Sequence, residues 1–273
     1  MLETKIRDDL GYLGDLDYMA EIVTSPGAVD ALIRLLQSND NLSIGDACLF
    51  IRDFVLSCSR NDICKKAWES ELESAIIPVL EHLLFADNHF TRQQVVYTLG
   101  KICSYDSVPV MLNAFYQLRD RDPILVPQLI IQLFELGIED CLELIYSTAA
   151  SDRYTTRWAI VAALDLFNYD SRNLEDPIFL MRYDFYQQMR HDLHPLVRAE
   201  AEYKYQFLEL QRRKHRENLS KSKYNKQRKA LKSLEISFVD VDDRFIENML
   251  NHNLHTYTVE ELEKFIDGEC HFS

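Results

Sequence analysis

An apolar pattern of helical period recurs along this chain and constrains its fold more than any other feature. Within FTRQQVVYTLGKICSYDSVPVMLNAF (90–115), Val95, Val96, Leu99 and Ile102 stand at i, i+1, i+4 and i+7, which places them on one face of a helix. Three further segments carry apolar residues at the same spacing: Ala47, Cys48, Ile51 and Phe54; Leu129, Ile130, Leu133 and Leu136; Ile160, Val161, Leu164 and Phe167. The recurrence predicts a set of helices that each bury the same face.

A second apolar pattern, at i, i+3, i+4 and i+7, precedes each of these segments and predicts a partner helix. Its positions are Val29, Leu32, Ile33 and Leu36; Ile76, Val79, Leu80 and Leu83; Val108, Met111, Leu112 and Phe115; Ile138, Cys141, Leu142 and Ile145. Each pair of patterns predicts two helices of about four turns joined by a short corner. The first helices start 47, 32 and 30 residues apart, a period typical of helical solenoids. The long first interval leaves room for an additional helix in NDICKKAWESELES (61–74).

Composition favours an all-α fold. The chain has only 7 Gly and 7 Pro, which is few for a sheet-rich fold with many tight turns. No apolar run reaches the ~18 residues that a membrane helix needs, and MLETKIRDDL at the start lacks the apolar core of a signal peptide. The six cysteines form no CxxC pair. We therefore expect a cytoplasmic protein with free thiols and no membrane span.

Three stretches resemble the HEAT and armadillo repeat superfamily. GAVDALIRLLQSND (27–40) is similar to an armadillo unit, whereas FTRQQVVYTLGKI (90–102) and RYTTRWAIVAAL (153–164) are similar to the second helices of HEAT units. The resemblance covers residues 25–211. It implies a right-handed α-solenoid of about five HEAT/armadillo-like helical hairpins with a C-terminal helical extension, in which the second helices line a concave surface.

The same resemblance implies a ladder of Asp and Arg side chains along the repeats. Asp87 and Asp152 stand five residues before Arg92 and Arg157, as in the family. A fifth unit, at 178–208, admits a polar residue on each helix face, as expected of a terminal repeat with a single neighbour. Two other units lack the arginine and should break the ladder; the residues there are Ile44 and Val126.

Charge divides the chain into blocks of alternating sign. RRKHRENLSKSKYNKQRKALK (212–232) carries ten Lys or Arg against one Glu, a net charge of +9, whereas residues 235–273 carry −8 and residues 1–211 carry −15. The last block should form one or two short helices that fold back on the repeats. The predicted organisation is an N-terminal helical cap (1–24), a repeat solenoid (25–211), a basic helical extension (212–234) and an acidic C-terminal cap (235–273).

The basic segment 212–232 is expected to be helical and exposed. Its cations could pair with the acidic blocks of the same chain, contact the phosphates of a nucleic acid, or bind an anionic membrane surface or an acidic protein. Tyr224 is its only aromatic residue, and the acidic remainder of the chain would repel a polyanion, so we expect no nucleic-acid partner. The candidate anion-binding residues are Arg212, Arg213, Lys214, Arg216, Lys226, Arg228 and Lys229.

No sequence pattern points to catalysis or to a bound cofactor. The sequence contains no GxSxG, P-loop, dinucleotide-binding or HExxH motif. His252, His255, Cys270 and His271 could be imagined as zinc ligands, but their spacing matches no recurrent zinc site. We therefore expect no catalytic residue, no metal and no cofactor.

The candidate binding surface is the face of the second helices opposite the core. On the helix at 154–166 this face is also apolar, with three alanines and a leucine, and an exposed apolar stripe commonly contacts a partner. A partner helix could lie there between aromatic anchors, or the segment 235–273 or the corner 168–177 could cover the stripe. The candidate protein-binding residues are Phe50, Tyr97, Lys101, Ala159, Ala162, Ala163, Leu166, Tyr203 and Phe207.

These observations predict a non-enzymatic scaffold or adaptor that binds a protein partner along the concave face of an α-solenoid, an inference that rests partly on analogy between folds. Two alternatives stay open. RYTTRWAIVAAL and HPLVRAEAEY (194–203) resemble HEAT-like bilin lyases, which attach or isomerise tetrapyrrole chromophores on phycobilisome subunits. The second alternative is nucleic-acid binding through the basic 212–232 helix, although HEAT-like glycosylases need a basic groove and the repeats are acidic.

Overall fold

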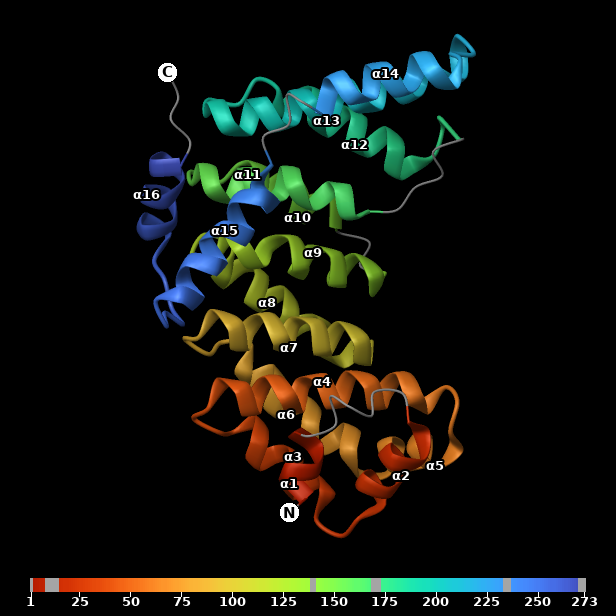
Figure 1. Cartoon of the computed structure of the whole chain (residues 1–273), viewed down its shortest axis with the longest axis vertical. Coiled ribbons are helices and arrows are strands. Elements are labelled where there is room, and N and C mark those ends of the chain that lie inside the picture. The colour runs from red at the N-terminus through yellow and green to blue at the C-terminus, as the bar shows by residue number, and fades with distance from the viewer. Residues whose placement is uncertain (1, 8–14, 138–140, 168–172, 233–236, 270–273) are drawn as a thin grey trace. The chain divides into compact units, whose positions relative to one another are not determined.

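The structure is a computed structural model that describes residues 2–7, 15–137, 141–167, 173–232 and 237–269. Its elements are α-helices with a few turns of 3-10 and π-helix, and the residues in these ranges include no β-strand (Figure 1). The expected all-α fold class is confirmed. The chain divides into two compact units, which we describe separately: residues 1–116 with 132–138, and residues 117–131 with 139–273.

The first unit is built from paired helices that stack on one another. Its elements are α1 (Leu2–Arg7), α2 (Leu16–Thr24), α3 (Ala28–Leu36), α4 (Asn41–Cys58), α5 (Asp62–Ala67), the π-helical turn η2 (Trp68–Leu72), α6 (Glu73–Leu83), α7 (His89–Ile102), η3 (Tyr105–Ser107) and most of α8 (Val108–Leu118). α3 packs on α4, and α6 packs on α7. α3 also contacts α6, and α4 contacts α7, so first helices stack on first helices and second helices on second helices.

Polar side chains set where these helices start. The Asp40 carboxylate accepts hydrogen bonds from the backbone N–H groups of Leu42 and Ser43 and caps α4. The Asn88 side chain accepts from the Thr91 N–H at 3.1 Å and caps α7. Such caps satisfy N–H groups that have no acceptor within the helix, so the corners before α4 and α7 end where the sequence places Asp40 and Asn88.

The second unit continues the pairing and adds the segment that follows it. Its elements are η4 (Pro123–Leu125), the first part of α9 (Val126–Glu135), α10 (Cys141–Ala149), α11 (Tyr154–Ala163), η5 (Leu164–Leu166), α12 (Pro177–Met189), α13 (Pro195–Arg216), α14 (Lys221–Lys232), α15 (Phe238–Asn251) and α16 (Val259–Glu269). α10 packs on α11, α12 packs on α13, and α11 contacts α13. α15 packs against α11, and α16 against α15 (Figure 1).

The predicted apolar faces lie in the core. All second-helix positions are buried except Ile102, which is half-buried, and the four first-helix patterns fall on α3, α6, α8 and the region of α10. Six first-helix positions are only half-buried: Val29, Ile33, Val79, Leu83, Val108 and Leu112. Leu142 is 49% exposed, and Ile138 lies outside the described residues. The predicted additional helix in 61–74 is present as α5 and the turn η2.

The basic segment is helical, as predicted, but it forms parts of two helices. α13 extends through Arg216, and Asn218 then adopts a left-handed backbone conformation with φ of 47°. The Leu219 N–H donates to the Lys214 carbonyl at 3.3 Å, a bond typical of helix ends that close on a left-handed residue. α14 starts after this break and packs back on α13.

Candidate interaction surfaces

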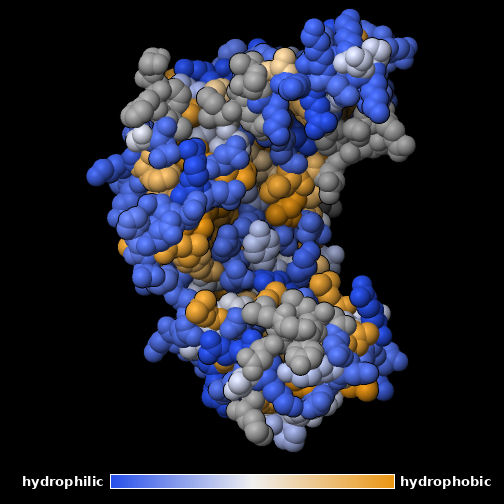
Figure 2. Space-filling model, viewed as in Figure 1, coloured by the Kyte–Doolittle hydropathy of each residue, from blue (hydrophilic) through white to orange (hydrophobic). Residues whose placement is uncertain are grey.

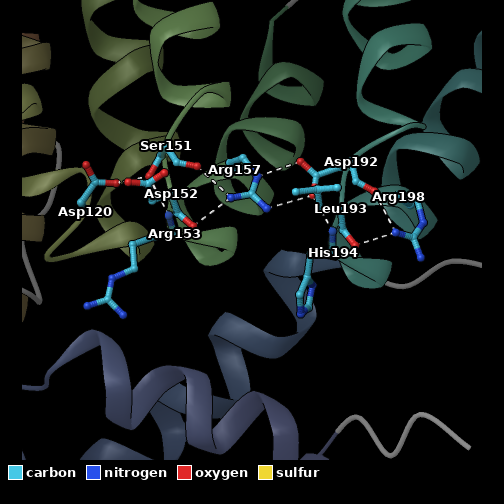
Figure 3. Close-up of polar contacts among 9 residues, drawn as sticks. All are labelled: Asp120, Ser151, Asp152, Arg153, Arg157, Asp192, Leu193, His194 and Arg198. Carbon is cyan, nitrogen blue, oxygen red and sulfur yellow. Dashed lines mark hydrogen bonds and ion pairs between the residues drawn. The ribbon is translucent and has the colours of Figure 1, made fainter.

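Arg157, in the first turn of α11, ties two corners of the second unit together (Figure 3). Its Nη1 donates to the carbonyl oxygens of Ser151 and Asp152 at 2.8 and 3.1 Å. Its Nε and Nη2 donate to the two carboxylate oxygens of Asp192, before α13, at 2.7 and 3.0 Å. The Ser151 hydroxyl donates in turn to Asp120. Successive corners of this unit are therefore linked in series, and the bidentate pair at their centre is largely shielded from water.

Two further arginines make the same backbone contact. Each donates Nη1 to the carbonyl oxygens of the residues six and five positions before it: Arg92 to Ala86 (2.6 Å) and Asp87 (2.9 Å), and Arg198 to Asp192 (2.8 Å) and Leu193 (2.7 Å). Together with Arg157, they give three corners the same local structure. The sequence motif identified Arg92 and Arg157 but missed Arg198, because Leu193 stands where the motif has an aspartate.

The alanine stripe expected to form a docking face is buried. Ala159, Ala162 and Ala163 are 0%, 4% and 0% exposed, whereas Leu166, in η5, is 48% exposed. α10, α13 and α15 all pack against α11, so the small side chains lie within the helix packing of the second unit. The three alanines are therefore not available to a partner helix. The alternative that residues 235–273 help to cover α11 agrees with the position of α15.

Phe238 anchors the start of α15 on α11 and α13. Its ring lies edge-on to the Trp158 ring, with centroids 5.3 Å apart, and both side chains are buried. Its backbone N–H donates to Glu200 Oε2, on α13, at 2.8 Å. Glu200 is fully buried, and this burial raises the pKa of its carboxyl to about 7.

Glu200 belongs to a cluster of charges that joins η5, α12 and α13, in which Glu200, Arg182 and Lys204 are buried and Asp165 is exposed. Lys204 Nζ lies 3.7 Å from Glu200 Oε1 and forms an ion pair with Asp165. Arg182 also pairs with Asp165, and the Tyr186 hydroxyl donates to Asp165 Oδ1 at 3.2 Å. Two cations face two carboxylates, which reduces the cost of burying Glu200, Arg182 and Lys204. The cluster thus holds helices of the second unit together.

Tyr257, between α15 and α16, fixes the C-terminal segment to the corner before η4. Its hydroxyl donates to Asp122 Oδ1 at 2.6 Å, and its ring lies edge-on to Phe245. Nearby on α15, Asp242 has a buried Oδ1 without a hydrogen-bond partner. Burial, followed by the charges of Asp243 and Asp122, raises the pKa of Asp242 to about 8. This helix therefore carries a carboxyl that folding makes harder to ionise.

The other candidate protein-binding residues are divided between the units. In the first unit, Phe50 is a core residue at 1% exposure, so it is not a surface anchor, whereas Tyr97 is 38% exposed and Lys101 is exposed. In the second unit, Tyr203 and Phe207 are half-buried on α13. Burial of Phe50 has a simple cause, since α4 is covered on two sides by α3 and α7.

α14 and the end of α13 form an exposed basic hairpin, which we call the basic hairpin (residues 206–232). α14 has no buried residue, and Figure 2 shows its surface as almost entirely hydrophilic. Lys214 Nζ lies 5.0 Å from the ring centre of Tyr224, so the two helices run antiparallel. The expectation that this region is helical and exposed is confirmed.

Most cations of the basic hairpin form no ion pair within the part of the chain that the structure describes. Arg212 pairs with Glu209 at 2.8 Å and Arg213 with Glu217 at 3.1 Å, both within the hairpin. Seven others form no ion pair with any residue that the structure describes: Arg216, Lys221, Lys223, Lys226, Arg228, Lys229 and Lys232. Among the described residues, the predicted pairing of the basic run with an acidic block of its own chain is therefore found only between Arg212 and Glu209.

The acidic C-terminal segment binds elsewhere in the second unit. Arg153, at the start of α11, forms ion pairs with Glu260 and with Glu263, the latter at 3.2 Å. Within the segment, Arg244 pairs with Glu269 at 2.7 Å. α16 also buries one apolar face, made of Val259, Leu262 and Ile266. An acidic amphipathic helix thus docks beside an arginine in this protein.

The two helices of the basic hairpin enclose a groove with a volume of about 430 Å³. Its wall on α13 contains Leu210 and Arg213, and its wall on α14 contains Ala230 and Leu231. Polar groups complete the lining: Gln206, Glu209 and Gln227. Sequence analysis identified the charges of this region but not the groove, because the break at Asn218 that folds α14 onto α13 has no Gly or Pro to signal it.

No protein-family model matches the chain, and no curated protein matches its sequence. Among the described residues, no group of three or more His, Cys, Asp or Glu is placed to hold a metal ion, and Cys270 and His271 lie outside those residues. Within the same ranges, no helix has both the length and the apolar character needed to cross a membrane. Function must therefore be argued from the surfaces themselves.

Proposed function

We propose that this protein is a non-enzymatic scaffold or adaptor of the HEAT/armadillo-like type that binds a protein partner. The observation that supports this most is the repetition of one corner structure, in which Arg92, Arg157 and Arg198 each bind the carbonyls six and five residues before them. Consecutive hairpins with linked corners bury their faces against each other and leave long polar surfaces free, which is how helical repeats present binding surfaces.

The surface that best fits a protein partner is the basic hairpin rather than the buried alanine stripe. Seven of its cations form no ion pair with a described residue, and they are concentrated on α14 and the end of α13, next to an apolar groove. Tyr97 and Lys101, on α7 of the first unit, form a second and smaller candidate surface.

Native-extract chromatography with light scattering tests the scaffold proposal. A scaffold should elute in a complex well above its own 32.0 kDa and retain the same co-eluting protein through a second affinity step. Tyr97→Ala/Lys101→Glu alters the candidate surface on α7. Its matched control is Tyr105→Ala, since Tyr105 is 74% exposed in a corner of the same unit. Elution of the wild-type protein alone from native extracts would contradict the proposal. A visible absorption change on mixing with a bilin would instead support the chromophore-handling alternative.

A further inference from the structure

We propose that the groove between α13 and α14 binds an acidic amphipathic helix of a protein partner. The inference rests on the proposed function, since it names the chemistry of the partner that the scaffold would hold. Three features carry it: the apolar floor of the groove, the cations beside it, and the fact that seven cations of the hairpin form no ion pair with a described residue.

The groove has the dimensions and lining of a helix-binding site. Leu210 on α13 and Ala230 and Leu231 on α14 give it an apolar floor, and its volume of about 430 Å³ accommodates several apolar side chains. Groove recognition of a helix relies on apolar side chains at i, i+3 or i+4, and i+7, which extend over about two helical turns. The lining on α13 covers a similar length, from Gln206 to Arg213.

The cations lie on the same helix faces as the groove. On α14, Lys223 and Lys226 stand seven and four residues before Ala230, which is the spacing of one helix face. On α13, Arg216 stands three residues after Arg213. The groove therefore continues from an apolar floor into a cationic end, and a partner helix should carry apolar residues on one face and carboxylates at the matching end.

The protein itself shows how such a helix binds. α16 buries Val259, Leu262 and Ile266 while Glu260 and Glu263 contact Arg153. The ion pairs of α15 and α16 are with Arg153 and Arg244, and no ion pair joins these helices to the basic hairpin among the described residues. The groove presents the same combination of apolar surface and cations without an occupant from the described parts of the chain.

Nucleic acid and membrane fit the groove less well than an acidic helix. A phosphate backbone would contact the cations but would leave the apolar floor unfilled, and Tyr224, the aromatic residue of α14, is already contacted by Lys214. Insertion into a bilayer needs large exposed apolar side chains, and α14 offers Leu231 alone, which lines the groove.

Direct binding of designed probes to the full chain tests the proposal. The probe is a fluorescent helical peptide of about 18 residues, with Leu at helical spacing on one face and Glu elsewhere. The comparison peptide has the same composition in scrambled order. We expect the patterned peptide to bind at least about tenfold more tightly than the scrambled one, by anisotropy at about 150 mM salt.

Substitutions in the groove test whether the patterned peptide binds there. Lys223→Glu/Lys226→Glu should weaken binding of the patterned peptide about tenfold or more, and Leu231→Asp should do the same through the floor. Lys65→Glu/Lys66→Glu on α5 is the matched control, since these lysines are exposed and belong to the first unit, and it should leave binding unchanged. If circular dichroism shows that a charge reversal disrupts the hairpin, Lys223→Gln/Lys226→Gln replaces it.

Several results would overturn the inference. Equal affinity for the two peptides would mean that charge alone is recognised. Tighter binding of single-stranded RNA of about 20 nucleotides, or of phosphatidylserine vesicles, would assign the basic hairpin to another ligand. Concentration-dependent self-association that the same variants abolish would identify the occupant as a second copy. If the native partner of the scaffold is retained by Lys223→Glu/Lys226→Glu, the groove assignment fails while the scaffold function stands.

Discussion

Replacing Asp242 with Asn should stabilise the second unit, and increasingly so as the pH rises. The pKa of Asp242 is about 8 in the folded protein because of burial and the charges of Asp243 and Asp122, against about 3.8 when it is exposed. A carboxyl whose pKa is raised by folding costs nothing below the unfolded value, and its cost grows until the pH passes the folded value. The stability penalty therefore develops between about pH 4 and pH 8.

The gap between 3.8 and about 8, at about 1.36 kcal/mol for each pH unit, sets a ceiling of about 5 to 6 kcal/mol. The Asp242 side chain is only half-buried, so water and local rearrangement should reduce this to about 1 to 3 kcal/mol. An amide also supplies N–H donors where the buried Oδ1 lacks a partner, which adds to the gain in Asp242→Asn.

Urea unfolding of wild type and Asp242→Asn at pH 5 and pH 8 measures the effect. The measurement uses a Trp68→Phe background, in which Trp158 is the remaining tryptophan. Its fluorescence follows unfolding of the second unit, where Trp158 packs against Phe238, so the two units are not treated as one transition. The advantage of the variant should be larger at pH 8 by at least about 1 kcal/mol. Asp240→Asn, an exposed change on the same helix, is the control and should shift both values by less than about 0.5 kcal/mol. An equal advantage at both pH values would refute the reasoning.

Three further predictions concern the packing. Phe238→Ala should destabilise the second unit by about 3 to 5 kcal/mol and make the segment after it sensitive to protease, and an intact proteolysis pattern would contradict the docking described above. Arg157→Ala should cost about 3 kcal/mol because it leaves Asp192 buried and unpaired, whereas a loss below about 1 kcal/mol would show that the linked corners do not matter for stability. Leu99→Ala should cost about 2 to 5 kcal/mol in urea unfolding, against less than about 0.5 kcal/mol for Leu56→Ala, which is 55% exposed; similar losses would mean that the helical register is wrong.

The spacing of apolar residues predicted most of the helices, because a helix that is buried on one face carries apolar residues at that spacing within its own sequence. Val95, Val96 and Leu99 are buried as expected, and so are Ile160 and Val161. The helix starts at Asp40 and Asn88 are also determined locally, since these side chains accept hydrogen bonds from N–H groups of the turn that follows them. These signals lie within a few residues of the structure they determine, which is why a single sequence can carry them.

The candidate surfaces were harder to predict because they depend on segments far apart in the chain. The alanine row of α11 looks exposed when only neighbouring repeats are considered, but the row is buried in a unit where α11 also packs against α15, many residues later. The pairing of Tyr257 with Asp122 spans 135 residues and has no local signature. The groove in the basic hairpin depends on Asn218 adopting a left-handed conformation, which asparagine tolerates but does not require.

The contacts that hold α15 and α16 have a consequence for synthesis of the chain. Arg153 and Glu263, which form an ion pair, are 110 residues apart in the sequence. The Trp158 ring packs against Phe238, which is synthesised much later. A nascent chain that has released α11 from the ribosome therefore exposes an apolar helix face until the later helices emerge. Contacts of such long sequence separation form late in folding. During translation, the second unit should accordingly pass through an incomplete state that chaperones can bind and that can aggregate if the C-terminal helices are delayed.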